Sequence, residues 1–158
     1  MEDQDARARA GLLFDAAWPG YRPMKARAHD LCRRYNALDE LDPQRQEIIP
    51  QIFDEIGEGF YVRGPLQVNC GVHTRIGKRF FANFNVTILN DVPVTIGDDV
   101  VVGAGSIVTH DLPSGWLAVG SPARPVRPID EADSVHSPGS LVHGRLSSEQ
   151  RPAGAGSD

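Results

Sequence analysis

The sequence predicts an all-β fold, a short parallel β-helix, preceded by an α-helical N-terminal segment and followed by a disordered C-terminal tail. The main observation is a six-residue repeat between Leu66 and Pro113, in which an aliphatic or small residue is followed by glycine. Its clearest units are Ile76-Gly77, Ile96-Gly97 and Val102-Gly103. A period of six does not match the 3.6 residues of a helical turn, and it fits a parallel β-helix. The alternative is a β-meander with glycine turns, which a period of six fits less well.

The first residue of each unit is expected to point inward and to stack on its equivalents in the coils above and below. Further members of this frame are Cys70, Ala82, Ile88 and Val108. Between Ile88 and Ile96 the spacing is eight rather than six. We interpret residues 90–93 as a small loop that bulges out of the wall, where Pro93 removes no ladder hydrogen bond.

Composition narrows the function classes for this chain of 158 residues. A net charge of −5 and 7% aromatic residues disfavour a nucleic-acid-binding surface. The acidic start, residues 1–5, does not resemble a signal peptide, and no apolar run is long enough to cross a membrane. Cys32 and Cys70 show no metal-binding or redox spacing, which indicates reduced, structural thiols in a cytoplasmic protein without a metal.

Helical patterns precede the repeat. The first helix is expected from Ala6 to Trp18, with a stripe of apolar residues, and it should end at Pro19-Gly20. That stripe consists of Leu12, Leu13, Phe14 and Ala17. A second helix is expected from about Pro23 to Leu38, because its apolar residues recur at intervals of three and four.

A third helix is expected to begin at Asp42-Pro43, which supply an N-cap and a proline at the first position. It should run through Ile56 and end at residues 57–59, with a kink or a late start because of Pro50. Residues 60–62 then form the first strand.

The chain therefore divides into a helical segment over residues 5–58, a β-helix over 60–128 and a tail over 130–158. The tail consists mainly of small and polar residues, so it should not offset the entropy cost of ordering and is expected to be disordered.

Several stretches together carry a family resemblance: Phe80–Thr87, Val94–Asp98, Gly103–Thr109 and Val119–Arg124, with Gly11–Phe14 and Arg33–Asn36 in the helical segment. They resemble the sugar O-acetyltransferases related to the maltose, galactoside and nodulation-factor acetyltransferases. The resemblance implies a left-handed β-helix, assembled as a homotrimer, that binds acetyl-CoA between subunits. The implied reaction transfers an acetyl group to a sugar hydroxyl, which requires a base for the hydroxyl proton and a pocket for the oxyanion.

The sequence departs from the family in its middle. Residues 94–99 run directly into residues 100–106, which resemble the final coil, so further coils and the loop with the catalytic histidine are missing. No residue here matches that histidine. His73, close in sequence to the expected acceptor site, is the candidate substitute base. The other histidines have structural or surface interpretations: His29 in the second helix, His110 at a solvated corner where the family usually has Lys, and His136 and His143 in the tail.

The remaining site residues are implied by the resemblance alone. The residues placed at the sugar acceptor are Asp15, Asn69, Asn83 and Asp91, of which Asn83 should lie near the acetyl group. Those placed in the CoA groove are Ala104, Gly105 and Ser106, with Thr109, Arg124 and Arg127 near the adenosine phosphates. A solvated helix residue, corner turns and surface charges are the structural alternatives for these positions.

Two hypotheses follow. The first is an acetyl-CoA-dependent O-acetyltransferase for maltose, glucose or a galactoside. The second is a truncated, catalytically inactive family member that serves as a trimeric scaffold or ligand-binding protein. A carbonic anhydrase on the same type of solenoid would need three histidines for zinc, and the coils carry two, His73 and His110.

Overall fold

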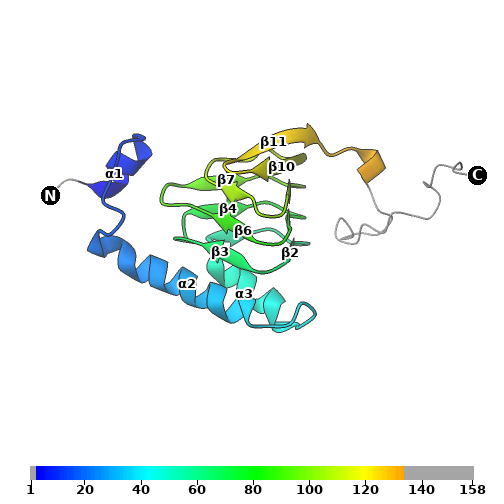
Figure 1. Ribbon diagram of the computed structural model, residues 1–158, viewed down its shortest axis with the longest axis horizontal. Helices are drawn as coiled ribbons and strands as arrows, with labels where there is room; N and C mark the ends of the chain where they lie inside the picture. The colour runs from blue at the N-terminus through cyan, green and yellow to red at the C-terminus, as the bar shows by residue number, and fades with distance from the viewer. Residues whose placement is uncertain (1–2, 134–158) are drawn as a thin grey trace, which may run out of the picture.

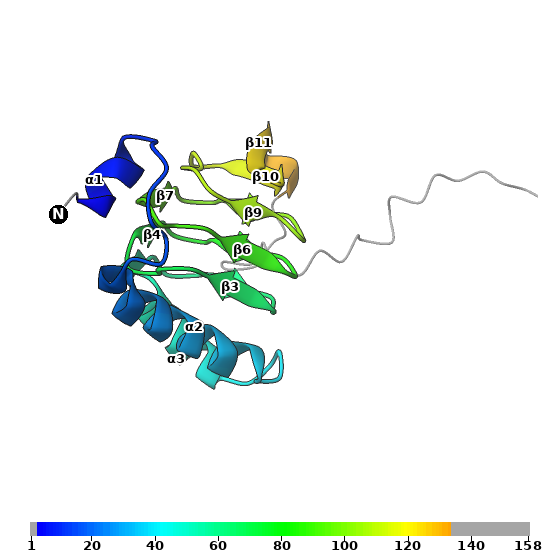
Figure 2. The same ribbon diagram turned by 60° about the vertical axis from the view of Figure 1, so that its left-hand side comes forward.

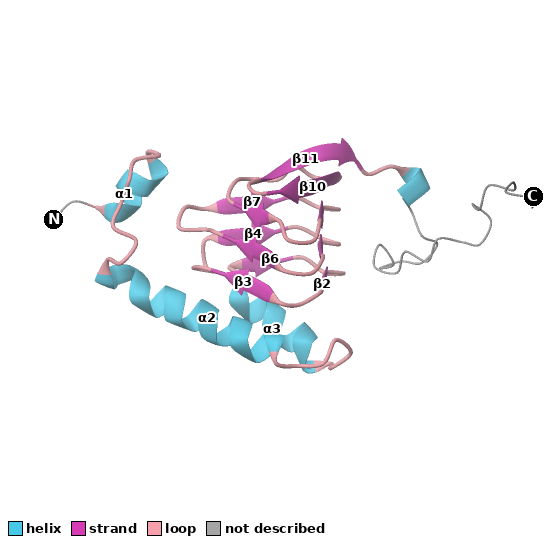
Figure 3. Cartoon of the chain, in the orientation of Figure 1, coloured by secondary structure: helices cyan, strands magenta, loops and turns pink. Residues whose placement is uncertain are grey.

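A computed structural model describes residues 3–133 of the chain. Helices α2 and α3 cover one end of a stack of short strands, and β10 and β11 lie at the other end (Figures 1 and 3). The helices are α1 (Gln4–Arg9), η1 (Pro19–Tyr21), α2 (Arg22–Asn36), α3 (Gln44–Ile52) and η2 (Glu131–Asp133). The strands are β1 (Glu55–Ile56), β2 (Tyr61–Val62), β3 (Leu66–Val68), β4 (Thr74–Ile76), β5 (Phe81–Ala82), β6 (Val86–Ile88), β7 (Val94–Ile96), β8 (Val101–Val102), β9 (Ile107–Val108), β10 (Trp116–Gly120) and β11 (Ala123–Pro128).

In the described part of the chain these strands form three sheets, in the orders β1-β4-β7, β2-β5-β8-β10-β11 and β3-β6-β9. Successive strands of one sheet pair in parallel with a shift of 20 residues through the first three coils, as Glu55 pairs with Arg75 and Arg75 with Thr95. Figure 2 shows β3, β6 and β9 stacked in this way. A meander would pair neighbours antiparallel, so the parallel β-helix is confirmed and the meander is excluded.

Each full coil uses inward residues at intervals of six, six and eight. The interval of eight recognised between Ile88 and Ile96 also separates Val68 from Ile76. The assignment of Cys70 to the repeating frame is therefore wrong, because Val68 is the inward strand residue and Cys70 is buried in the following corner. The third corner of each coil needs two additional residues, since its loops, residues 69–73 and 89–93, are wider than the other corners.

The sequence predicted that residues 90–93 bulge out of the wall. In the structure this loop is instead anchored to the preceding coil. Asn90 is fully buried, and its side-chain oxygen accepts a hydrogen bond from Cys70 N at 2.8 Å. Its side-chain nitrogen donates to Thr74 Oγ1 at 2.7 Å. Asn90 thus satisfies polar groups of the preceding coil that would otherwise be buried without partners.

The predicted first helix is too long. Helix α1 ends at Arg9, and Gly11 adopts a left-handed conformation with φ of 71°. Leu13, part of the expected apolar stripe, is 92% exposed, and its carbonyl oxygen accepts a hydrogen bond from Arg7 Nε. The segment after Gly11 therefore runs over the protein as an irregular strap instead of packing one helical face.

The predictions for the other helices hold in part. Helix α2 is confirmed. The N-cap of α3 is Pro43 rather than the expected Asp42, whose carboxylate accepts a hydrogen bond from Gln44 N at 2.9 Å. Helix α3 starts without delay and ends at Ile52, two residues after Pro50, so the expected continuation to Ile56 is wrong. Residues 55–56 instead form β1, because Glu55 and Ile56 pair with the strand one coil above.

The last coil is closed by a hairpin. Strand β10 pairs in parallel with β8 and antiparallel with β11, so β11 covers an edge that would otherwise remain open. Ile129 N then donates to Gly115 O at 2.7 Å, and residues 131–133 form η2. The expected disordered tail thus begins with a structured turn, and its residues from 134 onward lie outside the described part.

None of the described helices is both long enough and apolar enough to cross a bilayer.

Replacing Asn90 should test the role of the wide corner in stability. Asn90→Ala leaves the Cys70 amide and the Thr74 hydroxyl without their partner, and we expect a loss of about 2–5 kcal/mol in the free energy of unfolding. Leu89→Ala, at a neighbouring side chain that is 44% exposed, is the control and should cost less than about 1 kcal/mol. Urea denaturation would measure both. Equal stability of the two variants would contradict the bridging role.

Candidate functional site

Six of the residues predicted for the site lie at two different corners of the β-helix. The wide corner, residues 69–73 and 89–93, carries Asn69, His73 and Asp91. The narrow corner, residues 83–85 and 103–105, carries Asn83, Ala104 and Gly105. These corners are separated by the sheet β3-β6-β9, so one chain does not place Asn83 beside Asp91.

At the wide corner, the Asp91 carboxylate joins residues from successive coils and from α2. Asn69 Nδ2 donates to Asp91 Oδ1 at 2.8 Å, and Lys25 Nζ forms an ion pair with the same oxygen at 3.1 Å. Both ionic side chains are largely covered, at 19% exposure for Lys25 and 23% for Asp91. The carboxylate is therefore held in one orientation by two donors, and two of the predicted acceptor residues, Asn69 and Asp91, are brought into contact.

Lys25 also ties the N-terminal strap to this corner. Its ammonium group donates to Ala16 O at 2.9 Å and lies 5.4 Å from the ring centre of Tyr21. Asp15 is the neighbour of Ala16 and is exposed, and its Oδ1 accepts from Ala17 N at 2.9 Å. Lys25 was not identified from the sequence, where it is one of several basic residues along α2.

The buried groups near Asp91 are held in their protonated forms. Cys70 is 1% exposed, and burial, followed by the negative charge of Asp91, raises the pKa of its thiol to about 11. Burial is also the main reason that the pKa of Tyr21 is raised to about 12, with the Asp5 carboxylate contributing. Neither group provides a thiolate or a phenolate near neutral pH.

His73 lies at the same corner and is half-buried. Its Nδ1 is 3.2 Å from the backbone carbonyl oxygen of Asp91. Its own carbonyl oxygen accepts from Val94 N at 2.8 Å, which anchors its backbone to the coil above.

The narrow corner offers small, exposed residues. Ala104 and Gly105 are exposed, and the space around Gly105 is open. Asn83 Oδ1 accepts a hydrogen bond from Phe84 N at 2.8 Å, so this side chain is held in a local turn. Ser106 differs from its predicted neighbours, because it is fully buried and its Oγ accepts from Gly120 N at 3.1 Å. Its hydroxyl supports β10 and is not available on the surface.

Two of the three residues predicted near phosphates are brought together by a histidine. Thr109 Oγ1 lies 2.6 Å from His110 Nδ1, and Arg124 Nη1 lies 3.4 Å from the same nitrogen. The sequence suggested only a solvated corner for His110. The contact was not evident there because Arg124 is 14 residues away along the chain and reaches His110 through the closing hairpin.

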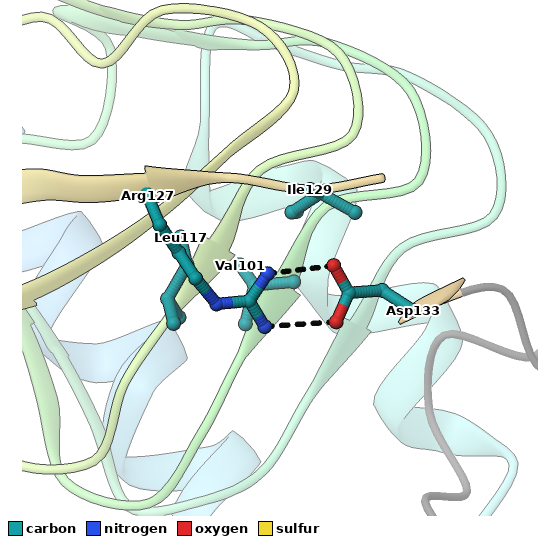
Figure 4. Close-up of a pocket in the computed structure, with 5 residues that line it drawn as sticks. All are labelled: Val101, Leu117, Arg127, Ile129 and Asp133. Carbon is teal, nitrogen blue, oxygen red and sulfur yellow. Dashed lines mark hydrogen bonds and ion pairs between the residues drawn. The ribbon is translucent and has the colours of Figure 1, made fainter. Parts of the chain in front are cut away.

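Arg127 has a different environment, shown in Figure 4. Its guanidinium forms two hydrogen bonds with the Asp133 carboxylate, at 2.7 and 2.8 Å, beside a small pocket of about 150 Å³. The pocket is lined by Val101, Leu117, Arg127, Ile129 and Asp133. The bonds from Arg127, and then one from Asp130 N, lower the pKa of Asp133 to about 2. Arg127 is thus already paired with a carboxylate.

Comparisons with known proteins match both parts of this structure. A family model described as the maltose acetyltransferase hexapeptide capping motif matches residues 7–57. The galactoside O-acetyltransferase of Escherichia coli (strain K12) is 28% identical over 182 positions, covering 80% of this chain and 90% of that protein. Nodulation protein L of Rhizobium meliloti (strain 1021) is 31% identical over 129 positions, covering 77% and 70% respectively. A solved galactoside acetyltransferase in complex with coenzyme A superimposes with a TM-score of 0.62 at 27% identity, covering 84% and 94% of the two chains.

A β-helix of six-residue repeats with a helical cap defines the class of hexapeptide-repeat acyltransferases. Within this class, the chain belongs to the family of the maltose, galactoside and nodulation-factor acetyltransferases.

The chain is a shortened member of this family. Since 80% of 158 residues is about 126, about 56 of the 182 positions aligned with the Escherichia coli protein have no residue of this chain opposite them. In the structure, β7 continues directly into β8 and β9 while keeping the 20-residue pairing with the coil before. Loss of whole coils therefore leaves the stack continuous, because each coil pairs only with its neighbours.

The buried thiols predict an alkaline loss of stability. Burial is the main cause that raises the pKa of both Cys32 and Cys70 from 9.0 to about 11. The folded chain therefore keeps protons that the unfolded chain releases, so the free energy of unfolding should fall as pH rises from 9 to 11, by up to about 3 kcal/mol per thiol. Below pH 9 the full contribution is present.

Urea unfolding of the wild type and of a Cys32→Ala/Cys70→Ala double variant, between pH 7.5 and 11, would measure this effect. The double variant should lose less stability over the alkaline range. The same pH slope in both proteins would show that the thiols do not cause it.

Proposed function

We propose that this chain is an acetyl-CoA-dependent O-acetyltransferase that acts on a sugar hydroxyl of the maltose, glucose or galactoside type. The observation that carries the proposal is the contact of Asn69 with Asp91 at 2.8 Å, because these two acceptor residues come from successive coils. A fixed carboxylate and an amide suit the recognition of several hydroxyl groups, which both donate and accept hydrogen bonds, and the exposed acid Asp15 lies on the strap that Lys25 ties to this corner. Coenzyme A in the similar galactoside acetyltransferase supports the donor.

In this proposal the acceptor sugar binds at the wide corner. Asp91 accepts a hydrogen bond from one hydroxyl, while Lys25 and Asn69 keep its carboxylate oriented. Asp15 approaches from the strap that Lys25 holds through Ala16. Orienting the hydroxyl before reaction reduces the entropy cost of reaching the transition state.

The acetyl donor runs from the narrow corner, which carries Ala104 and Gly105, to the end of β9, which Thr109 follows on the wide-corner edge. Ala104 and Gly105 leave room for the pantetheine arm, and Thr109 and Arg124 face the phosphates. Arg124 suits a phosphate because its guanidinium donates in a fixed fork. Arg127 contributes less to phosphate binding in this arrangement, because its guanidinium is already hydrogen-bonded to the Asp133 carboxylate.

The proposal includes a homotrimer. The outer side of β2-β5-β8-β10 is apolar, with Tyr61, Phe81, Val101 and Leu117 at paired positions. The outer side of β1-β4-β7 is polar by contrast, with Glu55, Arg75 and Thr95. Because Asn83 lies at a different corner from Asp91, a neighbouring copy is needed to bring an Asn83 amide to the acetyl group, where it would steady the oxyanion.

The second candidate, an inactive trimeric scaffold or ligand-binding protein, is favoured by the missing coils and the loss of the histidine that the family carries there. A turnover assay separates the two candidates. The purified chain is mixed with acetyl-CoA and with maltose, glucose or a galactoside, and the release of CoA thiol is followed together with the mass of the sugar product. Acetylated sugar supports the enzyme. Trimers that bind CoA without forming product support the scaffold.

Arg124 provides a prediction about the donor site. Arg124→Ala should weaken CoA binding about 10- to 100-fold, because a charge-assisted hydrogen bond is worth about 1.5–3 kcal/mol. Arg33→Ala, on an exposed arginine of α2, is the matched control and should bind CoA like the wild type. Isothermal titration calorimetry with CoA would measure both. Unchanged affinity in Arg124→Ala would remove Arg124 from the donor site.

A second variant tests the assembly. Val101→Glu places a charge in the apolar outer column, and it should convert trimers to monomers because burying a charge at an interface is costly. Arg75→Glu, on the polar outer side, is the control and should remain trimeric. Sedimentation equilibrium would report the masses, with circular dichroism as a check on folding. A monomeric wild type would contradict the trimer.

A further inference from the structure

We propose that His73 is the general base that removes the proton from the acceptor hydroxyl, replacing the histidine of the missing loop. The assignment rests on the acetyl transfer proposed above. The observation behind it is the position of His73 Nδ1, 3.2 Å from the backbone carbonyl oxygen of Asp91. This contact controls which ring nitrogen is free to react.

A carbonyl oxygen can only accept a hydrogen bond, so His73 Nδ1 must carry the proton that is shared with it. The neutral ring then has its lone pair on Nε2, the nitrogen that does not contact Asp91. A histidine that is oriented by a backbone carbonyl at Nδ1 and free at Nε2 has the arrangement of a general base. The ring is also half-buried, which limits the number of orientations that it can adopt.

His73 occupies the corner where the acceptor residues meet. It ends the loop that begins with Asn69, and the residue that orients its ring is Asp91, whose carboxylate holds Asn69. The hydrogen bond from Val94 N to His73 O ties its backbone to the coil above. The same short stretch of backbone therefore sets both the carboxylate that would bind the sugar and the ring that would take its proton.

Other titratable groups around Asp91 are poor bases. The Cys70 thiol and the Tyr21 hydroxyl are buried and protonated near neutral pH. Lys25 is an ammonium ion paired with Asp91, and the Asp91 carboxylate already accepts bonds from Lys25 and Asn69. The Asp5 carboxylate, from α1, faces the Tyr21 hydroxyl and contributes to the field at Cys70.

Histidines elsewhere in residues 3–133 lack this arrangement. His110 Nδ1 faces Thr109 Oγ1 and the guanidinium of Arg124, among the residues proposed to bind phosphate. His29 is exposed on α2. His73 is the described histidine that combines a carbonyl-anchored Nδ1 with a place at the acceptor corner.

Acetyl transfer by this route needs no reactant other than the acceptor sugar and acetyl-CoA. The acceptor hydroxyl oxygen attacks the thioester carbonyl carbon of acetyl-CoA, and its proton moves to His73 Nε2. The carbon–sulfur bond then breaks, and the proton passes from Nε2 to the leaving sulfur. The products are the sugar acetate and CoA thiol, and the imidazole returns to its neutral form.

The ring can be examined directly by nitrogen-15 NMR of the full chain, with the His73 signals assigned by their loss in His73→Asn. At a pH where the ring is neutral, we expect the proton on Nδ1 and the unprotonated nitrogen signal at Nε2. A proton on Nε2 would overturn the proposal whatever the activity, since that nitrogen would then have no lone pair for the hydroxyl.

Kinetics provides the second measurement. His73→Asn keeps an amide donor in reach of the Asp91 carbonyl oxygen but has no basic nitrogen, so it should fold normally. We expect kcat to fall about 10²- to 10⁴-fold while KM for acetyl-CoA is unchanged. Any dependence of kcat on pH that comes from the imidazole base should also disappear. His29→Asn is the matched control and should keep both the rate and the pH profile.

The outcomes separate the two proposals. An active wild type with an unchanged kcat and pH profile in His73→Asn would overturn the base role and leave the acetyl transfer standing. A wild type that forms no sugar acetate with any acceptor tested would overturn the proposed function, and the base role with it.

Discussion

The structure depends on the stacking of aliphatic side chains at the same inward positions of successive coils. Ile76 lies below Ile96, Ala82 below Val102 and Ile88 below Val108, and all of these side chains are at most 3% exposed. Burying each apolar side chain contributes about 1.5–3 kcal/mol, and the parallel ladders between coils satisfy the backbone. Because a coil gains this only from its neighbours, the ends need covers: α2 and α3 at the first coil, and β11 at the last.

This stacking also determines where the residues of the candidate site lie. The inward side chains of the strands must stack from coil to coil, so the sequence can vary mainly at the corners. The wide corner has two additional residues per coil. Those residues bring Asn69, His73 and Asp91 together, while buried Asn90 links the two loops to each other. The rigid wall is therefore the scaffold, and the variable corner is the place where a ligand can be recognised.

The same principle explains how a family member can lose whole coils. A solenoid of equal coils is not divided into a core and a periphery, so removal of a segment reconnects equivalent positions, as happens between β7 and β9 here. What is lost with the coils is the part of the site that they carried. The proposed acetyl transfer then needs a replacement from the residues that remain, and we propose the carbonyl-anchored ring of His73.

The β-helix, helix α2 and the inward residues from Ile76 to Val108 could be predicted from the sequence, because they depend on periodicity and on local turn chemistry. The sequence also identified the family, and it predicted Asn69 and Asp91 as acceptor residues, which the fold brings into contact. It misplaced the end of α1, because the strap after Gly11 is held by distant contacts such as Lys25 with Ala16. It also missed the first coil's β1, whose two residues are a strand only because β4 pairs with them. Four features became visible only in the folded chain: the ion pair of Lys25 with Asp91, the burial of Ser106, the pairing of Arg127 with Asp133 and the carbonyl oxygen that orients His73. Each of these features depends on contacts between residues from different turns or elements. The sequence pattern does not show which of those residues the fold brings close together.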